Sequence, residues 1–111
     1  MNWYIAKVVF NITNQESAQS QFEEQLRLIE ATSVEDAYLK AKTIGINSEE
    51  VFSNNNQITK RAFVDVADLM ELSSLKNGTE LYSRIHRTTE SRSYIHLMHQ
   101  RGMAIRLSAI Q

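Results

Sequence analysis

The chain has 111 residues, 42% of them hydrophobic, and a net charge of −1, which favours one folded domain over residues 1–111 rather than a disordered segment. It contains no cysteine, which excludes disulfides, thiolate metal ligands and a cysteine nucleophile. No stretch approaches the ~20 apolar residues of a membrane span, and the N-terminus lacks a signal-peptide pattern, so we expect a soluble cytoplasmic protein without membrane contact.

Residues 3–12 are predicted to form a first strand. Every second residue from Tyr4 to Ile12 is apolar, and Trp3, Ile5 and Val9 make the opposite face apolar as well. Two apolar faces are typical of a central strand that is covered on both sides. Residues 11–21 are polar, rich in Asn, Gln and Ser, and are predicted to form a loop.

Residues 22–46 are predicted to form a strand followed by a helix. The strand, residues 22–31, alternates, and then the period changes at Ser33, a natural N-cap with Asp36 at capping-box spacing. Gly45 is predicted to end the helix in the left-handed conformation. The helix carries an apolar stripe that needs a sheet to cover it, made of Val34, Ala37, Tyr38, Ala41 and Ile44.

The rest of the chain is predicted as strands and a last helix. Residues 51–52 form a short strand at best, Asn54 to Asn56 a turn, and residues 58–72 a β-prone run whose part 66–75 has a helix as its alternative. A turn at residues 76–79 precedes a strand at 81–85. A C-terminal helical tail covers about 91–107, although residues 103–109 also alternate and leave a terminal strand open.

These elements predict an α+β domain in the order β-β-α-β-β-β-α. A mostly antiparallel sheet of about five strands packs the first helix on one face, and a C-terminal helix follows.

Several stretches resemble a known family. They are Trp3-Tyr4-x-Ala6-Lys7, residues 22–28, the helix pattern Ser33-x-Glu35-x-Ala37-x-x-Lys40-Ala41, and Gly78-Thr79-Glu80-Leu81-Tyr82-Ser83-Arg84. On these the chain resembles a small bacterial family catalogued as domain of unknown function 4288, over roughly residues 3–85 and on into the tail. The Asn54 to Asn56 turn departs from it. The resemblance implies a compact α+β domain and no assigned activity, so no functional residue is carried over.

The histidines are the first candidates for chemistry. His96 and His99, three residues apart, lie on one side of a helical tail, and His86 is near in sequence. Imidazoles at this spacing can bind zinc, but a site needs a further ligand and only Glu90 is close. We therefore predict two surface histidines, no metal site and no cofactor.

Charge is the second candidate signal. Residues 1–56 hold four Lys or Arg against eight Asp or Glu, whereas residues 57–111 hold eight against five. Nucleic-acid binders usually have a pI above ~9, and this chain has a pI of about 6.3, so we predict no nucleic-acid binding. The basic region instead favours docking on an acidic half, within the chain or in a second copy. The arginines concerned are Arg84, Arg87, Arg92, Arg101 and Arg106.

No spacing forces two carboxylates together for acid–base work, and no Ser lies in a nucleophile elbow. The carboxylates considered are Glu23, Glu24, Glu30, Asp65, Asp68 and Glu80. We predict no catalytic residue.

The sequence thus favours a non-enzymatic cytoplasmic interaction module or accessory protein, which binds a protein partner or forms a homodimer through residues 94–111. The alternatives are a small immunity-type protein, and a small hydrolase or metal-dependent enzyme that uses the His- and Arg-bearing tail. For the tail itself, the competing expectation is that it covers Trp3, Ile5 and Val9 of its own chain.

Overall fold

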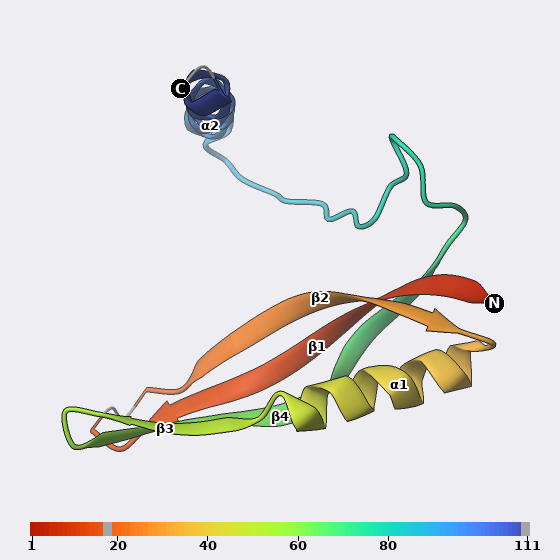
Figure 1. Ribbon diagram of the computed structural model, residues 1–111. Helices are drawn as coiled ribbons and strands as arrows, with labels where there is room; N and C mark the ends of the chain where they lie inside the picture. Colours follow the sequence, from red (N-terminus) through yellow and green to blue (C-terminus); the bar gives the residue numbers. More distant parts are fainter. Residues whose placement is uncertain (17–18, 110–111) are drawn as a thin grey trace. The chain divides into compact units, whose positions relative to one another are not determined.

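The computed structural model describes residues 1–16 and 19–109. Contacts divide the chain into two compact units, Met1–Leu81 and Tyr82–Gln111, and each is described here by itself. The order of elements is β-β-α-β-β-α (Figure 1). In the described ranges neither helix is both long and apolar enough to cross a bilayer.

The first unit is built on an antiparallel sheet with the strand order β2-β1-β4-β3. Its strands are β1 (Asn2–Asn14), β2 (Gln21–Ala31), β3 (Glu50–Asn54) and β4 (Gln57–Leu72). β1 lies in the middle, where Trp3 pairs with Glu30 on one side and with Leu72 on the other. The apolar character of both faces of β1 therefore predicted its central position correctly.

Helix α1 (Val34–Asn47) packs along one face of this sheet (Figure 1). The Ser33 side chain accepts a hydrogen bond from the Asp36 backbone N–H at 3.1 Å, as the N-cap residue of a capping box does. The Asp36 carboxylate accepts its bond from the Thr32 N–H at 3.0 Å, one residue before the cap. Beneath the helix lies the core of the unit, formed by small residues of α1 against the even-numbered side chains of β1 and the end of β2: Tyr4, Ala6, Ile29, Ala31, Ala37 and Ala41.

β4 carries two β-bulges opposite the middle of β1. Pairing skips one residue of β4 between Lys7 and Val8, and another between Val9 and Phe10. Each extra residue interrupts the alternation of faces and increases the local twist of the strand. The bulges let the sixteen-residue β4 follow the thirteen-residue β1 while Val66 and Leu69 still pack on the core under α1.

The hairpin between β3 and β4 confirms the predicted turn. Asn55 and Asn56 have φ of 53° and 65°, so both central residues are in the left-handed region that a two-residue hairpin needs. The second predicted turn also forms, with Gly78 at φ 90° and a hydrogen bond from the Thr79 N–H to the Lys76 carbonyl.

The prediction of about five strands is wrong, because the sheet has four. Residues 81–85 alternate in sequence, but they form no strand. β1 continues to Asn14, so the polar loop is shorter than expected; residues 17–18 within it lie outside the described residues. The helical alternative for residues 66–75 is also wrong, because β4 continues to Leu72.

Two expectations about α1 need correction. Gly45 does not end the helix: α1 continues to Asn47, and Gly45 is a buried helical residue without positive φ. Tyr38 is only half-buried, because its hydroxyl reaches out to the Asp65 carboxylate at 2.9 Å.

The second unit contains α2 (Ser91–Ala109), which confirms the predicted C-terminal helix and excludes the terminal strand at 103–109. None of the described residues of α2 is buried. Ile110 and Gln111, part of the expected interaction region 94–111, lie outside the described residues.

Candidate functional site

The face of the sheet opposite α1 is apolar over much of its length. In an antiparallel ladder directly paired residues share a face, so Ile5 lies between Leu28 of β2 and Met70 of β4. The same register places further apolar residues there. We call this set the open face, in which Ile5 and Leu72 are themselves buried, at 7% and 8% exposure, and the others are not: Trp3, Ile5, Val9, Phe22, Leu26, Leu28, Met70 and Leu72.

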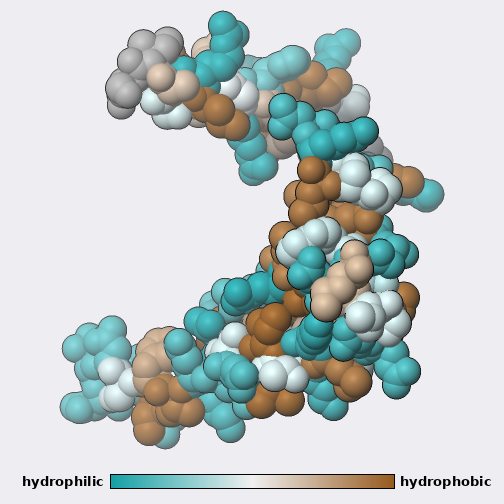
Figure 2. All heavy atoms as spheres, turned by 45° about the vertical axis from the view of Figure 1, so that its right-hand side comes forward, coloured by the Kyte–Doolittle hydropathy of each residue, from teal (hydrophilic) through white to brown (hydrophobic). Residues whose placement is uncertain are grey.

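No helix of the first unit's described residues packs on the open face. Its β2 side chains are the most exposed, with Phe22 at 64%, Leu26 at 49% and Leu28 at 48%. Exposed apolar residues gathered on one face, rather than scattered, indicate a surface that binds something. Figure 2 shows that apolar atoms remain at the surface of both units.

Charged side chains interrupt and border the open face. Lys7, between Ile5 and Val9, forms an ion pair with Glu24 of β2 at 3.9 Å. Glu30, opposite Trp3, and Asp68, opposite Lys7, add two carboxylates. The surface is therefore an apolar strip with a border of mainly negative charge.

Helix α2 is the second exposed apolar surface. Its large apolar side chains stay open, including Tyr94, Ile95, Leu97, Met103, Ile105 and Leu107. The helix has three arginines, Arg92, Arg101 and Arg106, and no acidic residue. Of the tail singled out by its sequence, residues 94–109 thus lie on one continuous helix, whereas Arg84 and Arg87 precede it.

The histidines do not come together as a metal site. The His86 ring stacks on Tyr94, with centroids 5.2 Å apart and planes 18° from parallel. His96 and His99 lie exposed on α2. Across residues 1–16 and 19–109, no group of three His, Cys, Asp or Glu side chains is placed to hold a metal ion. The absence of a bound metal in the working protein stays a prediction.

Two carboxylates, Asp65 and Asp36, have lowered pKa values, whereas a general acid at neutral pH requires a raised one. The carboxylate of Asp65 accepts hydrogen bonds from the Val66 backbone N–H and from the Tyr38 hydroxyl. Both lower the pKa of Asp65, and the Val66 N–H has the larger effect. Hydrogen bonding to Asp65 in turn raises the pKa of Tyr38. The Thr32 N–H lowers the pKa of Asp36 in the same way.

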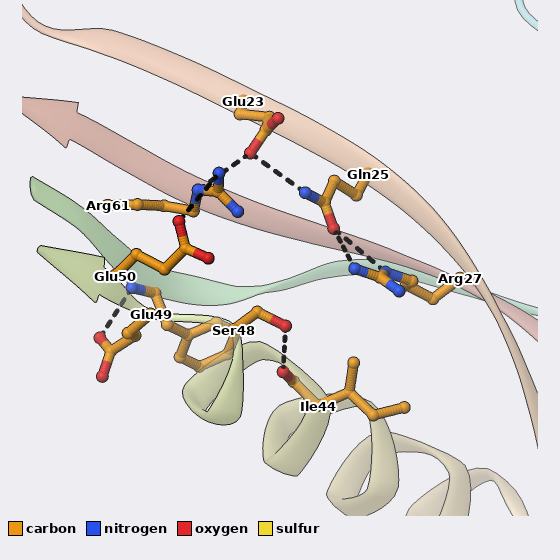
Figure 3. Close-up of polar contacts among 9 residues, drawn as sticks. Glu23, Gln25, Arg27, Ile44, Ser48, Glu49, Glu50 and Arg61 are labelled. Atoms are coloured by element: carbon orange, nitrogen blue, oxygen red, sulfur yellow. Dashed lines mark hydrogen bonds and ion pairs between the residues drawn. The ribbon is translucent and has the colours of Figure 1, made fainter. Parts of the chain in front are cut away.

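Arg61 forms a polar cluster that the sequence did not indicate. Its guanidinium lies between Glu23 of β2 and Glu50 of β3, at 3.5 and 3.8 Å (Figure 3). The same group lies 5.7 Å from the centre of the Phe10 ring. Gln25 extends the cluster by donating to Glu23 and accepting from Arg27. Arg61 neutralises both carboxylates, so Glu23 and Glu50 do not form a reactive pair. The cluster lies beyond the end of α1 and covers Phe10 there.

Several hollows lie on the surface of the first unit, and two of them reach about 400–450 Å³. One of about 400 Å³ lies at the end of the sheet and is lined mainly by amides, but Gln57 donates to Glu16 at 2.8 Å and Asn14 to Thr59 at 3.0 Å. The other, about 450 Å³, lies between α1 and the β2 edge and includes Leu28 and Leu39. Neither brings a titratable pair together with a nucleophile among its lining residues.

Comparison with known proteins gives one match. The model of the family described as "Domain of unknown function (DUF4288)" matches residues 3–83, which include α1 and all of the sheet except Asn2. No curated protein matches the chain. No solved structure matches it either.

Proposed function

We propose a function from the premise that the chain belongs to the DUF4288 family, whose model covers well over half of it. The protein is a non-enzymatic interaction module that works as a homodimer held together through residues 94–111. The observation that carries this proposal is that no described residue of α2 is buried and that all of its large apolar side chains except the half-buried Met98 are exposed.

The energetics of α2 support a partner. An isolated helix of this length is only marginally stable in water, and most helical stability in proteins comes from burying an apolar face. Covering one Leu or Ile side chain contributes about 1.5–3 kcal/mol. A second copy of the chain is present wherever the first is, and two-fold dimers are the commonest oligomers.

The surface chemistry supports binding rather than catalysis. Both candidate surfaces are apolar with a charged border, which is typical of protein interfaces. Asp36 and Asp65 have lowered pKa values, and the described histidines do not come together as a metal site. A cytoplasmic location, and the action of the whole chain as one domain, belong to the same proposal.

The test is the solution mass of the full chain by light scattering at several micromolar concentrations. We expect twice the chain mass of 12.8 kDa at the upper concentrations. The variant Leu97→Gln/Leu107→Gln, which keeps good helix formers, should be monomeric, and its first unit should keep the unfolding midpoint of the unmodified chain in urea. A monomeric mass for the unmodified chain throughout this range would overturn the dimer.

The matched control is His96→Gln/His99→Gln, which changes two polar residues of the same helix. It should remain a dimer. Elemental analysis of the unmodified protein tests the rival metal enzyme at the same time, and near-stoichiometric zinc that disappears in this variant would favour that rival.

A further inference from the structure

We infer that the open face of one copy is the docking site for α2 of the second copy, so that the two chains exchange their C-terminal helices. This inference rests on the proposed homodimer and names the surface through which it forms. The two elements match in length, in apolar pattern and in charge.

The lengths agree. A helix of 19 residues spans about 28 Å at 1.5 Å per residue. The open face follows β1 from Trp3 to Asn11, which is about 27 Å at 3.4 Å per residue. A helix laid along β1 would thus cover the apolar strip from end to end, as α1 covers the other face.

The apolar pattern of α2 calls for more than one covering surface. Tyr94, Met98 and Ile105 recur at i, i+4 and i+11, which places them on one side. Leu97, Ala104 and Leu107 recur at i, i+7 and i+10 on a second side. One sheet face can bury only one of these sides. In a two-fold dimer, the second side is free to meet its symmetry mate.

The charges are complementary between copies. Residues Met1–Leu81 contain seven Lys or Arg against twelve Asp or Glu, a net −5, and Tyr82–Gln111 contain five Arg against one Glu, a net +4. On the open face, Glu30 and Asp68 border the strip, and α2 supplies only positive charge. Such complementarity sets the partner's register and raises the association rate.

The absence of cysteine in the sequence permits a direct test. Leu28→Cys on the open face and Met98→Cys on α2 are made in separate full-length chains, which are mixed, left to exchange subunits and oxidised. The expected product is a disulfide-linked heterodimer. The doubly substituted chain should give covalent dimers on a non-reducing gel.

The control replaces Leu28→Cys with Phe52→Cys. Phe52 of β3 is comparably open, 47% against 48%, and its pairing through Thr59 with Asn14 places it on the other face of the sheet. It should give little cross-link to Met98→Cys. Without cysteines, Leu28→Gln should weaken dimerisation about tenfold or more, the scale of one well-buried interface side chain, and Phe52→Gln should leave it unchanged.

The outcomes separate this inference from the homodimer itself. A dimeric mass with only Met98–Met98 cross-links would overturn the docking site and leave the homodimer standing. A closed monomer from the doubly substituted chain would show that a chain's own helix is the occupant and would overturn exchange. A monomeric mass for the unmodified chain would remove both proposals.

Discussion

Gly45 of α1 lies directly against the ring of Phe63 on β4. A β-carbon built on Gly45 would overlap the Cδ1 and Cε1 atoms of that ring and come within 3.0 Å of Val8 Cγ1. The Phe63 ring in turn meets Phe10 edge to face, with centroids 6.3 Å apart. The helix can approach the sheet this closely only because residue 45 has no side chain.

Gly45→Ala should therefore destabilise the first unit, even though alanine is the better helix former by about 1 kcal/mol. Overpacking of this kind typically costs about 1–3 kcal/mol. Urea unfolding measures it. Gly102→Ala adds the same methyl group where nothing lies within 4 Å, so it should not lower the midpoint of the first unit. A Gly45→Ala protein as stable as the unmodified one would contradict the close contact.

Ala41→Asp should cost several kcal/mol, because Ala41 is fully buried in the core and an unpaired carboxylate would enter it. Tyr38→Phe, three residues earlier on α1, removes only an exposed hydrogen bond to Asp65 and should cost less than about 1 kcal/mol. Equal losses for the two variants in thermal unfolding would argue against this orientation of α1.

The contribution of Asp36 to the stability of α1 should decrease as the pH falls into the acid range. Its pKa is lowered in the folded chain, mainly by the Thr32 N–H, so it contributes stability above its unfolded pKa near 3.8 and loses it as pH falls through the folded value. Asp36→Asn should therefore be less stable than the unmodified chain at pH 7, and the difference should shrink below pH 3.8. Glu35→Gln controls for the charge of the first turn. A difference that stays constant from neutral to acid pH would contradict this linkage.

Arg61 should stabilise the sheet chiefly through its aliphatic stem. Its Nε is buried without a hydrogen-bond partner among the described residues, although it lies 3.5 Å from Glu23, and ion pairs of this kind contribute about 0–1 kcal/mol. Arg61→Met keeps an apolar cover near Phe10 and should cost less than about 1 kcal/mol. Arg61→Ala removes the cover and should cost about 1–2 kcal/mol. Equal losses of unfolding free energy for Arg61→Met and Arg61→Ala, measured in urea, would show that the charge of Arg61 dominates.

The sequence predicted best where period and end signals agree. The structure contains β1 where residues 3–12 alternate, and α1 begins after the Ser33 cap. The paired asparagines form the turn of the hairpin. β4 could not be assigned faces from its sequence, because two bulges shift its period within residues 63–68. Residues 81–85 alternate as a strand does, but a strand also needs a neighbour, which alternation does not specify.

The candidate surfaces were only partly predictable. The apolar and basic tail is visible in the sequence, and Trp3, Ile5 and Val9 marked the second face of β1. Phe22, Leu26 and Leu28 joined that face only once the register of β1 with β2 was known. The position of Arg61 between Glu23 and Glu50 depends on three strands at once, so no local pattern indicated it.

The strand order has a consequence for the newly made chain. Because Trp3 pairs with Leu72, β1 gains its second neighbour only after nearly the whole first unit has left the ribosome. Until then β1 can form a hairpin with β2 and receive α1, while its other edge offers unpaired N–H and C=O groups. Translation speed over residues 57–72, or a chaperone that shields this edge, should therefore influence how much of the protein folds correctly.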